Sequence, residues 1–138
     1  MNVYVDSSAL IKRVVAEPES EGLDLALAGH VADQDVLVSS SLAWVEVERA
    51  LRSIVSADLR FDVGESARVA MSGIAERVIG ADVVSLARRI DPPVLRTLDA
   101  IHLATAVLLD ADLVITYDDR LTAAARRNSL DVVAPAQT

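Results

Sequence analysis

The sequence contains no cysteine and few aromatic residues, and both absences narrow the possible chemistry. Without cysteine the chain has no disulfide bond, no zinc–thiolate site and no thiol nucleophile. Aromatic residues make up 3% of its 138 residues, whereas hydrophobic residues make up 52%. We therefore expect a core built from Val, Leu, Ile and Ala.

Long apolar runs are also absent. No segment reaches the roughly 18 consecutive apolar residues that a membrane span needs. No basic region precedes the first apolar run, which Asp6 interrupts, so no signal peptide is predicted. The expectation is one domain over 1–134, a short tail over 135–138, no membrane association and a cytoplasmic location.

Positive charge is scarce as well. The formal net charge is −8, and Lys12 is the single lysine beside twelve arginines. Phosphate affinity usually comes from a basic surface, so this balance argues against a nucleic acid partner. A protein of this charge that handles phosphates needs a bound cation or a local basic rim.

The apolar pattern predicts an α/β fold. Strands are predicted at 2–5, 36–38, around Val83, at 113–116 and at 131–133. Helices are predicted at about 7–14, 18–28, 42–57, 62–75, shortly before Pro92, at 97–109 and at 119–128. Predicted helix caps are Ser7 or Ser8, Ser41, Asp62, Thr97, and Asp118 or Asp119. This order indicates a three-layer α/β/α sandwich with a central, mainly parallel sheet of four or five short strands.

Two predicted strands end in an aspartate. Asp6 follows the first strand, and Asp118 and its neighbour Asp119 follow the strand at 113–116. Ligands of open parallel sheets bind at the carboxyl ends of the strands. A helix cap explains each aspartate equally well alone, and which member of the 118–119 pair is the cap stays open.

Two further acidic residues lie in predicted helices. At 100° per residue, Glu46 falls among the small residues of its helix, whereas Glu48 falls on the polar side. A carboxylate among small residues needs a partner, and Arg49 is the local candidate. Asp99 lies in the first turn of a nearly all-apolar helix, with His102 one turn later. A dipole interaction explains Asp99, and a buried hydrogen bond is the favoured explanation of His102.

Four converging carboxylates would have a defined chemistry. They cannot all stay ionised without a cation, and oxygen ligands favour Mg²⁺ or Mn²⁺ over zinc. Such a site typically hydrolyses phosphodiester bonds. A basic rim would hold the substrate strand; its candidates are Lys12, Arg13, Arg49, Arg120, Arg126 and Arg127.

The chain resembles the PIN-domain nucleases, and within them the VapC-type toxins of bacterial toxin–antitoxin pairs. The matching segments are VYVDSSALIKR, SSLAWVEVERAL, LRTLDAIHLATAVLLDADLVITYDDRL and LDVVAP, which together span nearly the whole chain. One departure is Asn128–Ser129, where relatives often have a glycine.

The resemblance implies a Mg²⁺- or Mn²⁺-dependent endoribonuclease that acts as the toxin of a type II toxin–antitoxin pair. By position, Asp6, Glu46, Asp99 and Asp118 form the catalytic and metal-binding quartet, supported by Ser7 and Thr116, with the role of Asp119 ambiguous. Homodimerisation, a VapB-like antitoxin and a tRNA or rRNA substrate are also implied. Trp44 is expected in the core rather than at the antitoxin contact.

Two alternative functions compete with the one that the resemblance implies. A non-catalytic PIN-like module that binds RNA or protein would be expected to lack one or more of the four acidic residues. A phosphoryl-accepting domain of the receiver or haloacid-dehalogenase type also places an aspartate after its first strand. A dehalogenase needs a second aspartate two residues after the first, where this chain has Ser8. A receiver needs paired acidic residues after the strand, whereas Asp6 is followed by Ser7.

Overall fold

The computed structural model describes residues 1–55 and 62–136. The strands are β1 (Asn2–Val5), β2 (Val36–Ser40), β3 (Ala75–Arg77), β4 (Leu113–Ile115) and β5 (Val132–Val133). The helices are α1 (Ser7–Lys12), α2 (Ser20–Ala32), α3 (Ser41–Val55), α4 (Val63–Ala70), α5 (Ala81–Ala87), α6 (Thr97–Leu108) and α7 (Asp119–Arg127). No described helix is long and apolar enough to cross a membrane.

The strands form one parallel sheet in the order β3-β2-β1-β4-β5. β1 is central, and Tyr4 pairs with Val38 of β2 and Val114 of β4. The chain moves outward from β1 to β3 and then returns to β4 on the other side of β1. Because such a switch in direction opens a crevice at the carboxyl ends of the strands, the segments after β1 and β4 border a natural binding site.

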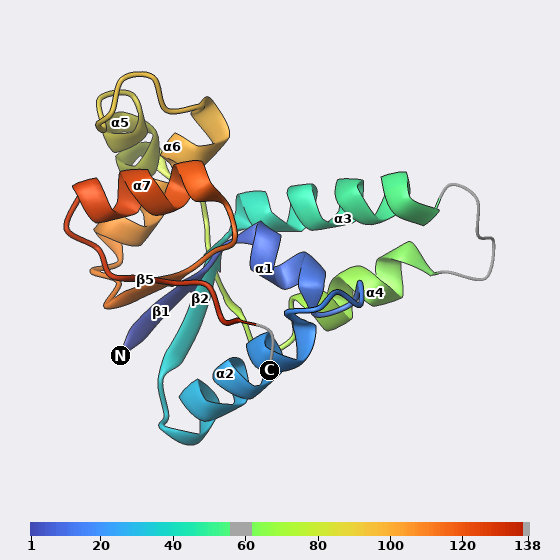
Figure 1. Cartoon of the computed structure of the whole chain (residues 1–138). Helices are drawn as coiled ribbons and strands as arrows, with labels where there is room; N and C mark the ends of the chain where they lie inside the picture. Colours follow the sequence, from blue (N-terminus) through green and yellow to red (C-terminus); the bar gives the residue numbers. More distant parts are fainter. Residues whose placement is uncertain (56–61, 137–138) are drawn as a thin grey trace.

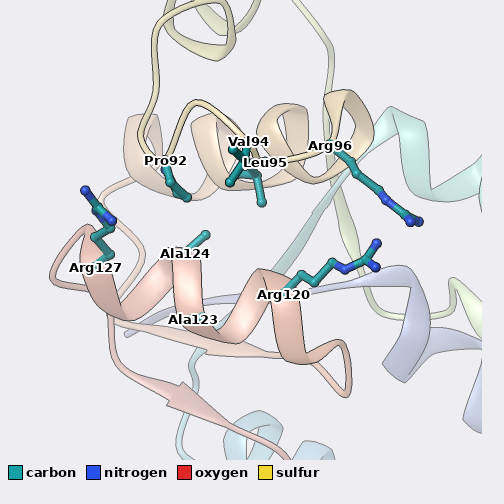
Figure 2. A pocket seen from close by; sticks show the side chains of 8 residues that line it. All are labelled: Pro92, Val94, Leu95, Arg96, Arg120, Ala123, Ala124 and Arg127. Carbon is teal, nitrogen blue, oxygen red and sulfur yellow. The ribbon is translucent and has the colours of Figure 1, made fainter.

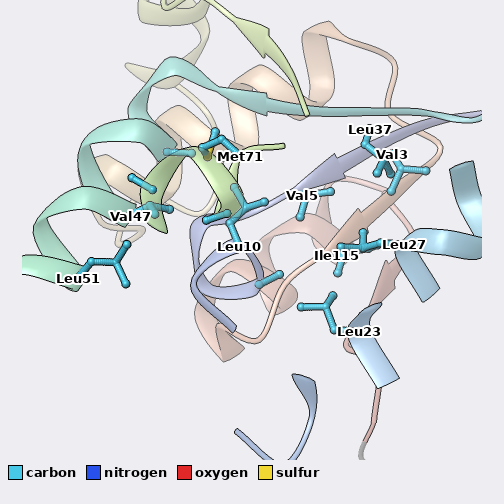
Figure 3. Packing of buried hydrophobic residues seen from close by; sticks show 14 residues of the cluster. Val3, Val5, Leu10, Leu23, Leu27, Leu37, Val47, Leu51, Met71 and Ile115 are labelled. Carbon is cyan, nitrogen blue, oxygen red and sulfur yellow. The ribbon is translucent and has the colours of Figure 1, made fainter. Parts of the chain in front are cut away.

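Helices cover both faces of the sheet and confirm the predicted three-layer sandwich (Figure 1). The main core cluster joins α1, α2, α3 and α4 to one face of the sheet, where Val3, Val5 and Ile115 are fully buried (Figure 3). Two smaller clusters join α6 and α7 to the other face. Trp44 packs against the main cluster, as expected of a core residue.

Strand alternation decides which face each β1 side chain reaches. Val3 and Val5 point into the main cluster, whereas Tyr4 between them packs with Ala106 and Val114 on the α6 side. Tyr4 is 1% exposed. Its hydroxyl is therefore directed toward α6, and this orientation positions part of the candidate site.

The third strand along the chain differs from the prediction. The strand expected around Val83 is wrong, because Val83 is a fully buried residue of α5, which begins after Gly80. The observed strand, β3, is the largely exposed segment Ala75–Arg77 at the edge of the sheet. Its pairing with β2 defines it, since its three residues carry no apolar pattern.

Several helix ends also differ from the prediction. Asp6 rather than Ser7 or Ser8 caps α1, and Thr97 is the first residue of α6 rather than its cap. Asp62 caps α4 as predicted, although that helix ends at Ala70. Residues 56 and 57, predicted at the end of the long helix, lie outside the described residues, as do 137 and 138 of the predicted tail.

The helices α3 and α4 run side by side and project away from the sheet (Figure 1). Val47 and Leu51, on the apolar side of α3, are fully buried. Ile54, one turn after Leu51 on the same side, is 55% exposed. The body of the domain no longer covers α3 at that point.

Candidate functional site

Asp6 lies where β1 passes into α1, and its two carboxylate oxygens have different surroundings. Oδ2 accepts hydrogen bonds from the hydroxyls of Ser8 and Thr116, both at 2.8 Å, and a longer one from the Ser8 backbone N–H at 3.4 Å. Oδ1 has longer contacts, to Ser7 Oγ and His102 Nε2, both at 3.5 Å. The carboxylate is thus held through Oδ2, while Oδ1 keeps capacity for a ligand.

Both expected supports, Ser7 and Thr116, contact Asp6, and Ser8 adds a closer contact that the sequence did not single out. Thr116 Oγ1 donates to Asp6 and accepts the backbone N–H of Asp118 at 3.0 Å, so it joins the ends of β1 and β4. Ser7 contacts Asp6 only through the long bond from its hydroxyl to Oδ1. Ser8 is the stronger support, because its hydroxyl also accepts the Tyr117 N–H at 2.9 Å.

Glu46 reaches the site from α3 and is held by a residue far away in sequence. Its Oε1 accepts a hydrogen bond from His102 Nε2 of α6. No bond joins Glu46 to Arg49, the expected partner, within the described residues. Glu48, two residues on, is exposed as predicted. The helical stripe therefore identified the inward carboxylate correctly and its partner wrongly.

His102 links the core to the site. Its Nδ1 is 2.5 Å from the Tyr4 hydroxyl, and its Nε2 contacts Glu46 and lies 3.5 Å from Asp6 Oδ1. Because a carboxylate only accepts, Nε2 carries a proton in either charge state of the ring. Tyr4 donates to Nδ1 when the imidazole is neutral and accepts from it when the ring is protonated. The core role favoured by the sequence is confirmed, but His102 also positions a site carboxylate.

The electrostatic environment of His102 favours its charged form. Burial disfavours the imidazolium, but the hydrogen bond to Glu46 and the charges of Asp6, Glu46 and Asp99 outweigh that cost and raise the pKa of His102. Burial is also the main reason why the pKa of Tyr4 is raised, so the phenol keeps its proton.

The charges of the other three members of the quartet all act on Asp99. Its pKa is raised by partial burial and then by the charges of Asp118, Asp6 and Glu46, with His102 acting in the opposite direction. These residues come from α6, the end of β4, the end of β1 and α3. Asp99 therefore lies within electrostatic reach of three carboxylates that come from other segments.

The ambiguity between Asp118 and Asp119 is resolved in favour of Asp118. Its Oδ1 caps α7 by accepting the backbone N–H groups of Arg120 at 2.8 Å and Leu121 at 3.0 Å. Its charge also acts on Asp99. Asp119 is exposed in the first turn of α7 and is not among the charges that shift Asp99. A cap and a site residue are therefore compatible in one side chain.

The donor set fits a hard divalent cation. All four acidic side chains offer oxygen, and the raised pKa of Asp99 records a concentration of negative charge that a cation would neutralise. In the part of the chain that the structure describes, no three potential ligands are already arranged around one point. Ions such as Mg²⁺ use one or two carboxylates and complete their shell with water and phosphate.

The expected basic rim is only partly available. Lys12 is bonded to Glu17 and Glu19 and lies 4.8 Å above the Tyr117 ring. Arg13 donates to the backbone oxygens of Ala70 and Ser72, at 2.7 and 2.8 Å. Both cations are thus engaged within the fold, and their place in an RNA-binding rim stays a prediction. Arg49 is exposed on α3.

The remaining candidates, Arg120, Arg126 and Arg127, all lie on α7 but line two different hollows. Arg120 and Arg127 line a groove against residues 92–96, whereas Arg126 lines a different hollow with residues 129–132. Arg126 is therefore removed from the rim, and Arg96, which the sequence did not single out, is added.

Comparison with known proteins now bears on this arrangement. The family model described as "PIN domain" matches residues 3–127. The chain belongs to the PIN-domain family. Among curated relatives, Ribonuclease VapC46 of Mycobacterium tuberculosis is 42% identical over 96% of this chain and 97% of that protein. Ribonuclease VapC35 of the same species is 38% identical over 98% of both chains.

Solved structures share the fold of this PIN domain at low sequence identity. VapBC2 from Rickettsia felis, bound to a promoter DNA fragment, has a TM-score of 0.74 at 10% identity and covers 96% of this chain and 98% of its own. VapC20 of M. tuberculosis, titled a sarcin-ricin loop cleaving toxin, has a TM-score of 0.69 at 16% identity and covers 88% and 94%. Both the fold class and the family suggested by the sequence are confirmed.

Proposed function

We propose that this PIN domain is a divalent-metal-dependent endoribonuclease and the toxin of a type II toxin–antitoxin pair. The observation that carries the proposal is the convergence of acidic side chains from separate segments: His102 Nε2 contacts Glu46 and lies 3.5 Å from Asp6 Oδ1, and Thr116 joins Asp6 to the Asp118 backbone. Asp99 lies within electrostatic reach of all three acidic residues. The names of its relatives, which are VapC ribonucleases, supply the substrate class. Within that class, tRNA and rRNA are the proposed targets.

The residues of the chain divide the work of such a site. Asp6 and Asp99 would hold a Mg²⁺ or Mn²⁺ ion, with Glu46 and Asp118 completing the site. Ser8 and Thr116 fix Asp6 through Oδ2, and His102 fixes Glu46. A divalent ion supplies charge that neutralises the scissile phosphate and favours attack by water.

The proposal includes protein partners. The solved structures that share this fold include VapBC2 and a toxin–antitoxin complex from Klebsiella pneumoniae. We therefore propose a VapB-like antitoxin as the cognate inhibitor. A homodimer is proposed from the family resemblance.

The catalytic proposal is tested with neutral substitutions in matched pairs. Asp6→Asn and Asp99→Asn are each expected to reduce cleavage of total RNA in Mg²⁺ by at least about a hundredfold, because even residues that merely orient metal ligands contribute 10- to 100-fold. Glu46→Gln should show a clear loss, while Glu48→Gln on the exposed face of the same helix should retain wild-type activity. Full activity of Asp6→Asn or Asp99→Asn would refute this site, whereas absence of RNA cleavage by the wild type in Mg²⁺ would favour a non-catalytic binding module.

A further inference from the structure

A groove borders the carboxylate site and carries three arginines (Figure 2). It lies between α7 and the segment leading into α6, has a volume of about 620 Å³ and is lined by Pro92, Val94, Leu95, Arg96, Arg120, Ala123, Ala124 and Arg127. This volume lies in the range of about 300–1,000 Å³ that is common for ligand sites.

The spacing of residues on α7 explains how the groove forms. Arg120, Ala123, Ala124 and Arg127 follow the i, i+3, i+4, i+7 pattern of a single helix face. The two arginines are therefore separated by two turns, about 10 Å along the axis. The alanines between them are too small to fill the space. This gives a hollow with a cation at each end.

The opposite wall of the groove is fixed in place. Leu95 packs with the buried cluster that contains Ala124, so the floor is continuous with the core. The Asn128 side chain donates to the backbone oxygens of Asp91 and Ala124, both at 2.9 Å, which ties the wall to the end of α7. The groove is thus preformed rather than created by a ligand.

The guanidinium groups of the groove are available to a ligand. Arg96, Arg120 and Arg127 are exposed, and none makes a side-chain hydrogen bond or ion pair in the ranges 1–55 and 62–136. Lys12, Arg13 and Arg77 are instead bonded within the fold. In a chain of net charge −8, three unpaired cations around one hollow make it complementary to an anionic partner.

One end of the groove lies at the starts of α6 and α7, the two helices that carry Asp99 and Asp118. Arg120 directly follows the Asp118–Asp119 pair, and its backbone N–H is bonded to Asp118. Arg96 is the cap of α6 and precedes Asp99 by three residues. In Figure 2 the side chains of Arg96 and Arg120 extend toward the same end, while Arg127 lies at the other. The end of the groove with Arg96 and Arg120 is therefore the end nearer to Asp99 and Asp118.

We infer that this groove, bounded by Arg96, Arg120 and Arg127, binds the phosphates of the RNA strand on one side of the cleavage point. The inference rests on the proposed ribonuclease function. Guanidinium groups bind phosphate oxygens in bidentate fashion, and the aliphatic floor accommodates sugars and bases without stacking. An RNA strand is the occupant favoured here, because a substrate must extend beyond its scissile phosphate and two groove arginines lie at the starts of the helices that carry Asp99 and Asp118.

The test measures binding without cleavage. The probe is a fluorescein-labelled 12-nucleotide oligouridylate, and its anisotropy is recorded with the purified chain in EDTA at 20–150 mM KCl. For single-stranded nucleic acids, each neutralised phosphate contributes about 0.7 to the slope of log K against log salt. Arg120→Gln and Arg127→Gln should each flatten the slope by about 0.7, and together by about 1.4. Each should weaken binding about fivefold at low salt, the upper end for an exposed charge pair.

The chain offers a matched control in the next residue. Arg126→Gln changes the net charge by the same amount but lies outside the groove, so it should leave the slope unchanged. Ala123→Glu, at an exposed helix position, should weaken binding as Arg127→Gln does. Melting temperatures of all variants check that the fold is intact.

Several results would overturn the inference. They are undetectable binding by the wild type, equal effects of the Arg126 and Arg127 variants, and no effect of any variant. If Arg127→Gln weakened binding of a labelled hexaglutamate peptide but not of RNA, the groove would belong to a protein partner.

Failure of the catalytic proposal would look different. In that case Asp6→Asn would still cleave RNA, whatever the binding slopes of the groove variants.

Discussion

The bond between Tyr4 and His102 gives a prediction about both stability and metal binding. In Tyr4→Phe the buried Nδ1 of His102 loses its partner, and at 1% exposure of the imidazole water cannot replace it. An unsatisfied buried polar group costs about 1–3 kcal/mol. For a domain of this size, the melting temperature should fall by roughly 4–12 °C.

The same substitution should affect the site through Glu46. Without Tyr4, the imidazole is no longer held at both nitrogens, so the carboxylate bonded to Nε2 is less well positioned. Loss of such an orienting contact typically weakens metal affinity or activity 10- to 100-fold. We expect about a tenfold rise in the Mg²⁺ concentration that half-saturates RNA cleavage, measured at a temperature where the variant is fully folded.

Tyr117→Phe is the matched control for this prediction. The Tyr117 hydroxyl donates to the Pro135 backbone oxygen at 2.7 Å in a part-buried position, where water can take its place. Its loss should cost less than about 0.5 kcal/mol. Urea unfolding compares the two variants. Equal stabilities would refute the Tyr4–His102 bond, and a destabilised Tyr4→Phe with unchanged Mg²⁺ dependence would limit that bond to a structural role.

Three further predictions concern other parts of the molecule. Mg²⁺ at a hundred times its Kd should stabilise the wild type by about 2.7 kcal/mol, and EDTA or Asp99→Asn should abolish the shift in melting temperature. Ser129→Gly should raise stability by roughly 0.5–1 kcal/mol in urea unfolding, because Ser129 has φ 64°, which favours glycine; no gain would contradict this. Hydrogen bonds from its own backbone and from Lys12 lower the pKa of Glu19. The ionised Glu19 therefore stabilises the fold above its ordinary pKa of 4.5, and this stabilisation is lost as pH falls through the folded-state pKa. Lys12→Gln should therefore be less stable than the wild type at neutral pH and converge with it on acidification; stability curves that stay parallel down to pH 3 would argue against the ion pair.

The parts of the fold that the sequence predicted are those with a strong local pattern. β1 and β4 are short apolar runs followed by an aspartate, and both lie where they were expected. β3 could not be found in this way, because Ala75–Arg77 is an exposed edge segment that becomes a strand through pairing with β2. Val83 has the β-branched character of a strand but is buried in α5, where packing overrides local propensity.

In the site, too, features with a local sequence pattern were predictable and features that depend on distant contacts were not. Glu46 was identifiable because it interrupts a helical stripe, a signal contained within 15 residues of sequence. Its partner His102 is 56 residues away, and the strand alternation that turns Tyr4 toward α6 supplies the other half of the contact. The contacts of Lys12 and Arg13 could not be predicted, because the groups that bind them, such as Glu17 and the Ala70 carbonyl, depend on how loops and helices meet.

The acidic net charge itself yields a final prediction about how metal and RNA bind together. Three groove arginines attract the strand, but the four carboxylates at its inner end repel it. A divalent ion that neutralises the carboxylates should therefore strengthen RNA binding, and by linkage RNA should strengthen ion binding by the same factor. Ca²⁺ prefers the same oxygen ligands and allows a test with the oligouridylate probe, with a gel to check that the probe stays intact.

Adding Ca²⁺ should tighten RNA binding, whereas KCl of equal ionic strength should weaken it through screening. The opposite signs make the comparison decisive. If Ca²⁺ weakened binding as KCl does, the carboxylates and the groove would not act on the same strand. Asp99→Asn removes one of the repelling charges, so the same reasoning requires it to bind RNA more tightly than the wild type in EDTA and to gain less from Ca²⁺.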